Sequence, residues 1–246
     1  MKREPGKGMK AAGLYSQRGS SLIEMMTAMA AGLVVLLAAL QAMLYFQREF
    51  ARHQAQIAQQ QDVRLGLELF EQEIRLAGWE SLSIARPDAV EFTANVSGFM
   101  TNVNAPVLAG QTALTVDDGR GWPENKTVRV CWEDQCENFT LARGGARNVL
   151  TLVEPAPRPI PPGASVMVMN RLRYYSRRGE DGIVKWLRQI DGGASVMAGD
   201  LARVRLSYWD AQGRPTMQPN SVRRIVVEIA LAGRPVNEVR EIALRM

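Results

Sequence analysis

The 246-residue sequence is poor in the residues that most often carry catalysis and metal binding, with a single histidine and only two cysteines. Ser-His-Asp catalysis would have to use His53, which lies in a helix-forming stretch far from any pocket of a globular domain. Cys131 and Cys136 have no further metal ligands near them in the sequence, which argues against zinc. We therefore expect no catalytic residues, no metal and no cofactor, in a protein that is not an enzyme.

The chain also has little net charge beyond residue 19. The total is +5, but residues 1–19 contain five basic residues and one acidic residue, which leaves 25 basic and 24 acidic residues in the remainder. This near-neutral remainder argues against a general nucleic-acid-binding surface, and no nucleic-acid partner is expected. One cluster of basic and aromatic residues could contact DNA, and this remains an alternative. The same residues are also explained by an ordinary strand whose side chains alternate between two faces. The members of this basic-aromatic cluster are Arg171, Arg173, Tyr174, Tyr175, Arg177 and Arg178.

An uncharged apolar run occupies residues 25–46. Its 22 residues are enough for a helix to cross a hydrocarbon core of about 30 Å. The basic residues before it predict a cytoplasmic leader, with everything after residue 46 exported. Glu24 lies at the entry to the run, where an unpaired charge deep in lipid costs about 2.5 to 3.5 kcal/mol. In an oxidising compartment the two exported cysteines favour one disulfide, Cys131–Cys136.

The segment before the apolar run does not follow the order of a secretory signal peptide, whose cleavage site comes after the apolar region. Here Gly19-Ser20-Ser21-Leu22-Ile23-Glu24 precedes it. A basic leader, a glycine, the letters S-L-I-E and a long apolar run resemble the type IV prepilin class, which comprises pilins, minor pilins and secretion pseudopilins. The resemblance implies that prepilin peptidase cleaves after Gly19 and N-methylates Ser20, where the family usually has Phe. The leader begins at Met1 or at an alternative start, Met9.

The same resemblance gives Glu24 a role in assembly. Cleavage would create an ammonium group at Ser20, and a carboxylate four residues further along can pair with its own terminus or with that of a neighbouring subunit. Such a pair is strong in a low-dielectric filament core, so Glu24 would set the register of insertion. The alternative is an interfacial acid in the first turn of a plain signal anchor.

Residues 47–77 continue the helix, because they contain no proline and are rich in good helix formers. An apolar stripe predicts that this part is covered by a domain, and Gly78-Trp79 is expected to end the helix. Glu71 and Arg75 form an i,i+4 pair within a segment, E-x-x-x-R-L-A-G, that resembles PilW-type minor pilins. The stripe consists of Val63, Leu67, Phe70, Ile74 and Ala77.

The rest of the chain, residues 80–246, reads as a β-rich head. Residues 80–110 are expected to be irregular apart from a strand at 89–93, and the proline-rich segment 155–163 to be extended. The two cysteines bracket a turn at residues 133–135, and the C-terminal strands resemble those of PilW-like and J-type pseudopilin domains. Acidic pairs occur at Asp117-Asp118, Glu133-Asp134 and Glu180-Asp181. Calcium binding by one of these loops is an alternative, although each pair is typical of a solvated turn. Further strands are expected at 113–116, 127–132, 137–142, 148–153, 165–176, 183–188, 201–209, 222–231 and 238–244.

The predicted fold is α+β and pilin-like: a long N-terminal helix, transmembrane in its first half, packed by its second half on an antiparallel sheet. The expected parts are a leader (1–19), an assembly helix (20–46), its amphipathic continuation (47–79) and the head (80–246). The resemblance implies a minor pilin that acts in pilus assembly, priming or a tip complex. Its partners would be prepilin peptidase, the major pilin and other minor pilins. It would reside in the bacterial inner membrane, head periplasmic, before entering the pilus. The alternatives are a minor pseudopilin of a type II secretion system and a signal-anchored periplasmic binding protein.

Overall fold

The computed structural model of the chain describes residues 21–77, 81–133, 135–232 and 237–244. The expected leader, with Gly19 and Ser20, lies outside the described residues, and so does the helix stop at Gly78-Trp79. The chain divides into two compact units, and the boundary between them falls between Ala55 and Gln56. Because this boundary lies inside one helix, that helix contributes to both units.

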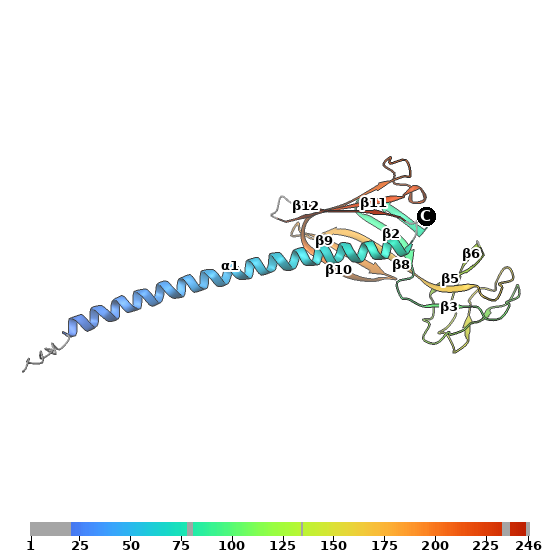
Figure 1. Cartoon of the computed structure of the whole chain (residues 1–246), viewed down its shortest axis with the longest axis horizontal. Coiled ribbons are helices and arrows are strands. Elements are labelled where there is room, and N and C mark those ends of the chain that lie inside the picture. The colour runs from blue at the N-terminus through green and yellow to red at the C-terminus, as the bar shows by residue number, and fades with distance from the viewer. Residues whose placement is uncertain (1–20, 78–80, 134, 233–236, 245–246) are drawn as a thin grey trace, which may run out of the picture. The chain divides into compact units, whose positions relative to one another are not determined.

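The helix α1 (Leu22–Ala77) has 56 residues (Figure 1). It contains no proline and is rich in Ala, Leu, Gln and Glu, which lose little conformational freedom in a helix. Glu24 lies in its first turn and Arg75 in its last, where an acid and a base respectively favour the helix dipole. The long helix expected from the sequence is confirmed over this range.

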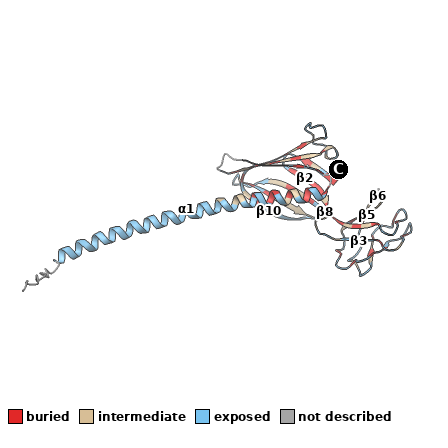
Figure 2. Ribbon diagram, viewed as in Figure 1, coloured by how far each residue is buried: buried red, intermediate tan, exposed pale blue. Residues whose placement is uncertain are grey.

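In the first unit, α1 is exposed along its whole described length, with only Glu49 partly buried (Figure 2). The most apolar part of the helix has none of its residues buried, and it is long and apolar enough to cross a membrane. The sequence prediction of a membrane-capable first half is confirmed in this sense.

The second unit is built from antiparallel strands. They are β1 (Leu82–Arg86), β2 (Ala89–Ala94), β3 (Met100–Asn102), β4 (Ala113–Thr115), β5 (Thr127–Trp132), β6 (Gln135–Thr140), β7 (Val149–Thr151), β8 (Ser165–Arg178), β9 (Val184–Ile190), β10 (Gly193–Trp209), β11 (Arg224–Leu231) and β12 (Asn237–Ala243). The main sheet has the order β1-β2-β8-β9-β10-β11-β12. β3 and β5 pair with the first part of β8, β6 pairs with β5, and β4 pairs with β7.

The main sheet curls, so that strands separated by several neighbours come together. The backbone N–H of Leu206 on β10 donates to the carbonyl of Pro87 at 2.9 Å, in the turn between β1 and β2. The hydroxyl of Tyr208 donates to the carbonyls of Arg86 and Ala89, at 2.9 and 3.0 Å. These bonds close the sheet around the buried part of α1 and satisfy a hydroxyl that would otherwise be buried unpaired.

The C-terminal part of α1 packs on this sheet through the stripe that the sequence predicts. Val63, Leu67, Phe70, Ile74 and Ala77 are all buried, in one core with side chains of the seven main strands. The ring of Phe70 lies edge-on to two aromatic rings of the sheet, with centroids 4.8 Å from Tyr174 and 6.0 Å from Trp186. The α+β layout, with the second half of the helix covered by an antiparallel sheet, is therefore confirmed.

A glycine permits the closest approach of helix and sheet. A Cβ atom at Gly66 would lie 3.1 Å from the ring of Trp186, which is itself fully buried. Contacts that short are rare, so a larger residue would push α1 away from β9 or force the indole out of its position. The indole therefore fills the space that the missing side chain leaves.

Residues 100–168 form a small β-module with a core of its own. β8 joins this core to the main one: Val166 and Val168 are buried in the module, whereas Leu172 and Tyr174 belong to the main core. Figure 1 shows β3, β5 and β6 grouped apart from β9 to β12. The other members of the module core are Val103, Val107, Leu114, Val116, Trp122, Val128, Val130, Phe139, Leu141, Leu150, Leu152, Ala156, Ile160 and Ala164.

Most predicted strands are present, but the expectation of an almost irregular stretch at 80–110 is wrong. It contains β1 and β3 beside the predicted β2. β3 has three residues, too few for alternation to stand out, and it owes its strand conformation to pairing with β8, about 65 residues away in the sequence. β10 begins at Gly193, well before the predicted start at residue 201, because β9 extends the pairing in that direction. No strand includes residues 155–163, although Ile160 bridges to Val107.

The main core predicts a sharp difference between two apolar residues of α1. Phe70→Ala removes a fully buried ring and is expected to lower the free energy of unfolding by about 3 to 5 kcal/mol. Leu65→Ala, five residues earlier on the exposed face, should change it by less than about 0.5 kcal/mol. Urea unfolding of both variants in the same detergent checks this, and equal losses would contradict the packing.

Candidate functional site

Of the three residues with predicted roles in cleavage or assembly, Gly19, Ser20 and Glu24, the structure describes Glu24. It is exposed in the first turn of α1, and its backbone N–H donates to the carbonyl of Ser21 at 2.9 Å. Its own carbonyl accepts the hydroxyl of Thr27 at 3.0 Å. Within residues 21–77 its carboxylate forms no hydrogen bond or ion pair.

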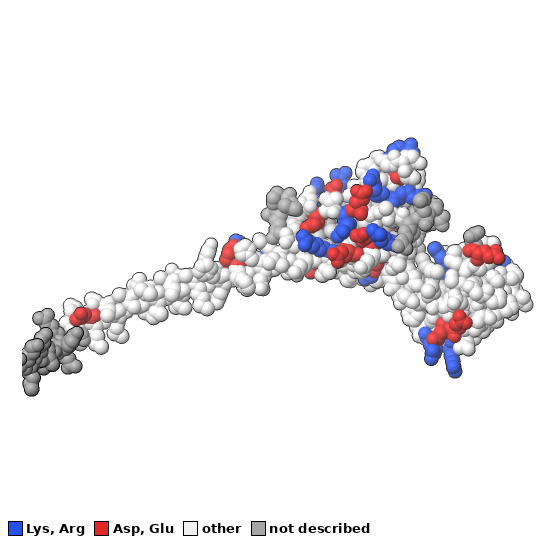
Figure 3. Space-filling view, in the orientation of Figure 1, with Lys and Arg blue, Asp and Glu red and all other residues white. Residues whose placement is uncertain are grey.

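The residues that follow Glu24 present an apolar surface. Large side chains such as Met29 and Phe46 are 70% exposed or more. Figure 3 shows this part of α1 as white surface with few charges. His53 lies beyond it, exposed on the same helix with its Nε2 atom 3.5 Å from Glu49.

A buried ion pair fixes the helix to the sheet in the second unit. Glu73 on α1 is 4% exposed, and Nε of Arg188 on β9 donates to it at 2.9 Å while a second guanidinium nitrogen binds its other oxygen. The hydroxyl of Tyr174 on β8 donates to the same carboxylate at 2.5 Å. One carboxylate thus receives three hydrogen bonds from two strands, and we call this group the Glu73 anchor.

The electrostatics keep the two donors of the Glu73 anchor, Tyr174 and Arg188, in their protonated forms. Burial, the hydrogen bond to Glu73 and the charge of Glu73 raise the pKa of the Tyr174 hydroxyl, which stays a donor at any physiological pH. The hydrogen bond to Glu73 raises the pKa of Arg188 and outweighs its burial. The desolvation of the two charges offsets much of their attraction, so the intact pair adds little net stability.

Sequence reasoning missed Glu73, although the signal was present. The buried positions Gly66, Phe70, Glu73 and Ala77 follow one another at spacings of 4, 3 and 4 on α1. On that face, the apolar periodicity predicts Phe70 and Ala77 as core residues but not Glu73. A pair between Glu71 and Arg75 is predicted separately. This pair does form, at 2.7 Å. An acid on an otherwise apolar helical face indicates a buried cation opposite it.

The predicted disulfide is present between Cys131 and Cys136, whose Cα atoms are 4.1 Å apart. The two residues are directly opposite each other in the β5–β6 hairpin, and Trp132 pairs with Gln135, so the turn is shorter than predicted. Asp134 in this turn lies outside the described residues. Arg158 further ties the hairpin down, with an ion pair to Glu137 and a hydrogen bond to Gln135, both at 2.7 Å.

In two of the acidic turns a carboxylate, of Asp118 or of Asp181, accepts hydrogen bonds from a residue two positions further along the chain. Hydrogen bonds from the side chain and backbone of Arg120 lower the pKa of Asp118 to about 2. Asp181 accepts the backbone N–H of Ile183 at 3.0 Å. Among the described residues, no three side chains of His, Cys, Asp or Glu come together as a metal site would require.

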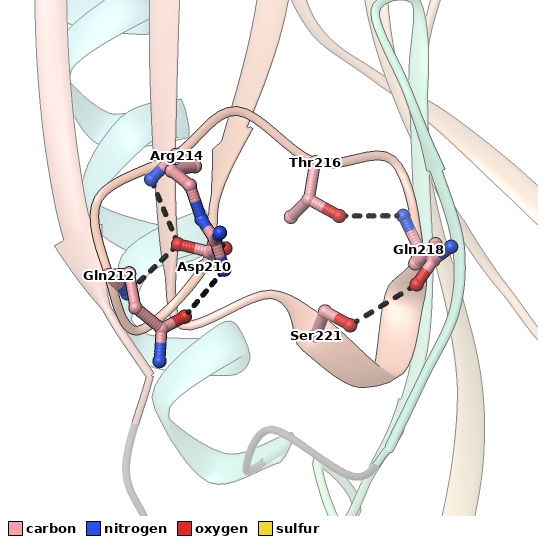
Figure 4. Close-up of polar contacts among 6 residues, drawn as sticks. All are labelled: Asp210, Gln212, Arg214, Thr216, Gln218 and Ser221. Carbon is pink, nitrogen blue, oxygen red and sulfur yellow. Dashed lines mark hydrogen bonds and ion pairs between the residues drawn. The ribbon is translucent and has the colours of Figure 1, made fainter.

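The loop between β10 and β11 is likewise organised by its own polar groups (Figure 4). Asp210 accepts the backbone N–H of Arg214 at 2.8 Å and that of Gln212 at 2.9 Å, and these bonds lower its pKa. The hydroxyl of Thr216 accepts the backbone N–H of Gln218, which leads into the short helix η2 (Pro219–Ser221).

The basic-aromatic cluster is divided between the two faces of the sheet. Tyr174 is buried in the Glu73 anchor, whereas Arg171 lies on the other face and binds Glu91 through Nε at 2.8 Å. Beside it, Asp191 accepts hydrogen bonds from Lys126 at 2.6 Å and from Asn170 at 2.8 Å. Burial acts to raise the pKa of Asp191, but these bonds outweigh it and hold the pKa below its ordinary value.

Removing the Glu73 anchor should cost much more than removing a surface charge. Glu73→Ala leaves the buried hydroxyl of Tyr174 and the largely buried guanidinium of Arg188 without their acceptor, and we expect a loss of about 3 to 5 kcal/mol in unfolding free energy. Glu68→Ala, on the exposed side of α1, should stay within about 0.5 kcal/mol of the wild type. Chemical denaturation measures both, and a Glu73→Ala variant as stable as Glu68→Ala would contradict the role of the anchor.

Asp191 predicts a pH dependence of stability. Its folded-state pKa lies below the unfolded value of about 3.9, so its contribution is complete above about pH 5 and is lost progressively as pH falls through the unfolded and then the folded-state pKa. The melting temperature of Asp191→Asn should therefore fall less steeply than that of the wild type between about pH 5 and pH 3. Asp62→Asn, an exposed change on α1, should follow the wild-type curve. Parallel curves for Asp191→Asn and wild type would contradict this assignment.

Comparison with known proteins finds no significant match. No protein-family model matches the chain, and neither a curated protein nor a solved structure is significantly similar to it.

Proposed function

We propose that the protein is a minor subunit of a type IV pilus, which acts in priming or in the tip complex after prepilin peptidase removes residues 1–19. The observation that carries the proposal is the division of α1 into two apolar surfaces. The stripe from Val63 to Ala77 is buried by the sheet, whereas the apolar residues from Leu22 to Phe46 are exposed. An exposed surface of that size needs lipid or other helices around it.

Glu24 distinguishes an assembly helix from a plain membrane anchor in this proposal. It lies at the start of the exposed apolar surface and its carboxylate is unpaired within the described part of α1. The ammonium group created at Ser20 by cleavage would supply the partner, in the same subunit or in the next one along a filament. The pair would be worth far more between packed helices than at a wet surface.

Two alternatives follow from the same features. A minor pseudopilin of a type II secretion system would use the same cleavage, the same Glu24 pairing and the same inner-membrane stage. A signal-anchored periplasmic binding protein would use residues 20–46 only as a tether and would need no cleavage at Gly19. Neighbouring genes that encode minor prepilins, a pilus tip protein or a secretion operon would separate the first two assignments.

The proposal predicts maturation followed by Glu24-dependent assembly. In a strain with prepilin peptidase, mass spectrometry should find Ser20 as the N-terminal residue. Glu24→Leu should lower the amount of this subunit in sheared filaments by at least about tenfold, since even about 1.4 kcal/mol of lost pairing has that effect. Glu49→Leu on the same helix should leave incorporation within about twofold of wild type. Glu49 is paired with Arg52 and His53 of its own helix, and such exposed pairs contribute little free energy. A mature protein that retains Met1 or Met9 would contradict the proposal.

A helix replacement separates assembly from tethering. Exchange of residues 20–46 for an unrelated transmembrane helix should abolish pilus formation if the helix packs against other subunits. Normal function of the exchanged protein would instead establish the signal-anchored alternative.

A further inference from the structure

The outer face of the main sheet contains a polar cleft of about 620 Å³, which we call the β8 cleft. It lies beside the small β-module, whose residues 125–127 form one wall. Its volume is within the range of about 300 to 1,000 Å³ that is usual for small-molecule sites. The residues that line it are Glu91, Thr93, Asn125, Lys126, Thr127, Met169, Arg171, Arg173, Gln189, Asp191 and Gly192.

The floor of the cleft is set by strand register. On β8, Arg173 lies opposite Glu91 of β2 and opposite Gln189 of β9, while Arg171 lies opposite Thr93. Side chains alternate along a strand, and Leu172 on β8 is buried in the main core. The two arginines therefore point away from α1, into the cleft.

Most charges in the cleft are already paired. Glu91, 4% exposed, accepts hydrogen bonds from Arg171 at 2.8 Å and from the hydroxyl of Ser83 at 2.9 Å. Asp191 is bonded to Lys126 and also accepts the backbone N–H of Arg171 at 2.8 Å. These pairs make a rigid polar wall with two carboxylates fixed as hydrogen-bond acceptors.

Arg173 is the exception among the charged residues of the cleft. Its Nε atom is buried and has no acceptor within the described residues, and its guanidinium forms no ion pair there, although its charge acts at longer range on Glu91 opposite it. The guanidinium lies 5.2 Å from the centre of the Tyr175 ring, which holds it in place from one side. The terminal nitrogens of this guanidinium have no acceptor among the described residues, and a planar carboxylate can accept two parallel N–H bonds from such a group.

We propose that the β8 cleft binds a short acidic saccharide whose carboxylate is held by Arg173. Thr93, Asn125, Thr127 and Gln189 supply neutral donors and acceptors along the cleft, and a ligand rich in hydroxyl groups uses both kinds. An acidic peptide fits less well, because β2, β8 and β9 are each paired on both sides and offer its backbone no strand edge. The inference does not depend on the assignment to a pilus.

The test is titration of the full-length protein in detergent micelles with trigalacturonate, followed by isothermal calorimetry. Trigalacturonate should bind, and uncharged maltotriose should bind at least about tenfold more weakly, since it lacks the carboxylates that Arg173 recognises. Arg173→Gln should weaken trigalacturonate binding by at least about tenfold, and Arg173→Lys by less, because lysine retains the charge but not the guanidinium fork.

Arg177→Gln is the matched control, since it removes the same charge from the same strand and the same face, about 13 Å further along. It should bind trigalacturonate within about twofold of wild type. If Arg173→Gln melts at a lower temperature, the Nε–H resonance of Arg173 in the wild-type protein serves instead, and it should shift on titration.

Several outcomes would overturn the proposal. They are no saturable binding of trigalacturonate by the wild type, equal affinity for maltotriose, wild-type affinity in Arg173→Gln and an unmoved Nε–H resonance. Equal or tighter binding of the peptide acetyl-Glu-Glu-Glu-amide would assign the cleft to acidic peptides and reject the saccharide.

Discussion

The burial of one face of α1 beneath a curled antiparallel sheet is the contact on which the second unit depends. Seven strands contribute to a core that the helix completes, and Phe70 meets three aromatic rings there. The inner face of the sheet is apolar and would be exposed to solvent without the helix. The charged residues of the β8 cleft lie on the outer face. The helix is therefore a core element of the head as well as a connection to the apolar segment.

The Glu73 anchor adds direction to this packing. Apolar contacts alone allow a helix to rotate or slide by a fraction of a turn at modest cost, because many packings bury similar areas. A carboxylate that must meet both Arg188 and Tyr174 permits one register only. Gly66 reinforces the choice, because only at this residue can the backbone of α1 approach the ring of Trp186 so closely.

The sequence predicted the features that local pattern controls. The helix, its buried stripe, the C-terminal strands and the Cys131–Cys136 disulfide all follow from periodicity or from the spacing of the cysteines, and all are present. β1 and β3 escaped prediction because they are short and are held by pairing with distant strands. The β8 cleft was also beyond the sequence, since its members come from four strands, β2, β5, β8 and β9, and from two connecting segments that only the fold brings together.

The prediction for the basic-aromatic cluster illustrates the same limit. Its residues are neighbours in sequence, but alternation along β8 sends Tyr174 to the core and Arg173 to the outer face. One short segment thus contributes to two chemically different environments, a buried ion pair on one side and a polar cleft on the other. Composition alone cannot separate these contributions, because it does not record which face each residue occupies.

β8 has a mechanical consequence as the strand common to both cores. Its first residues pair with β3 and β5 and its later residues with β2 and β9, so it has neighbours on both sides along most of its length. A tensile load applied to the small β-module would reach the main sheet through the backbone of this strand. Hydrogen bonds that flank a central strand resist such a load in shear, many at once, instead of opening one after another as at a free edge.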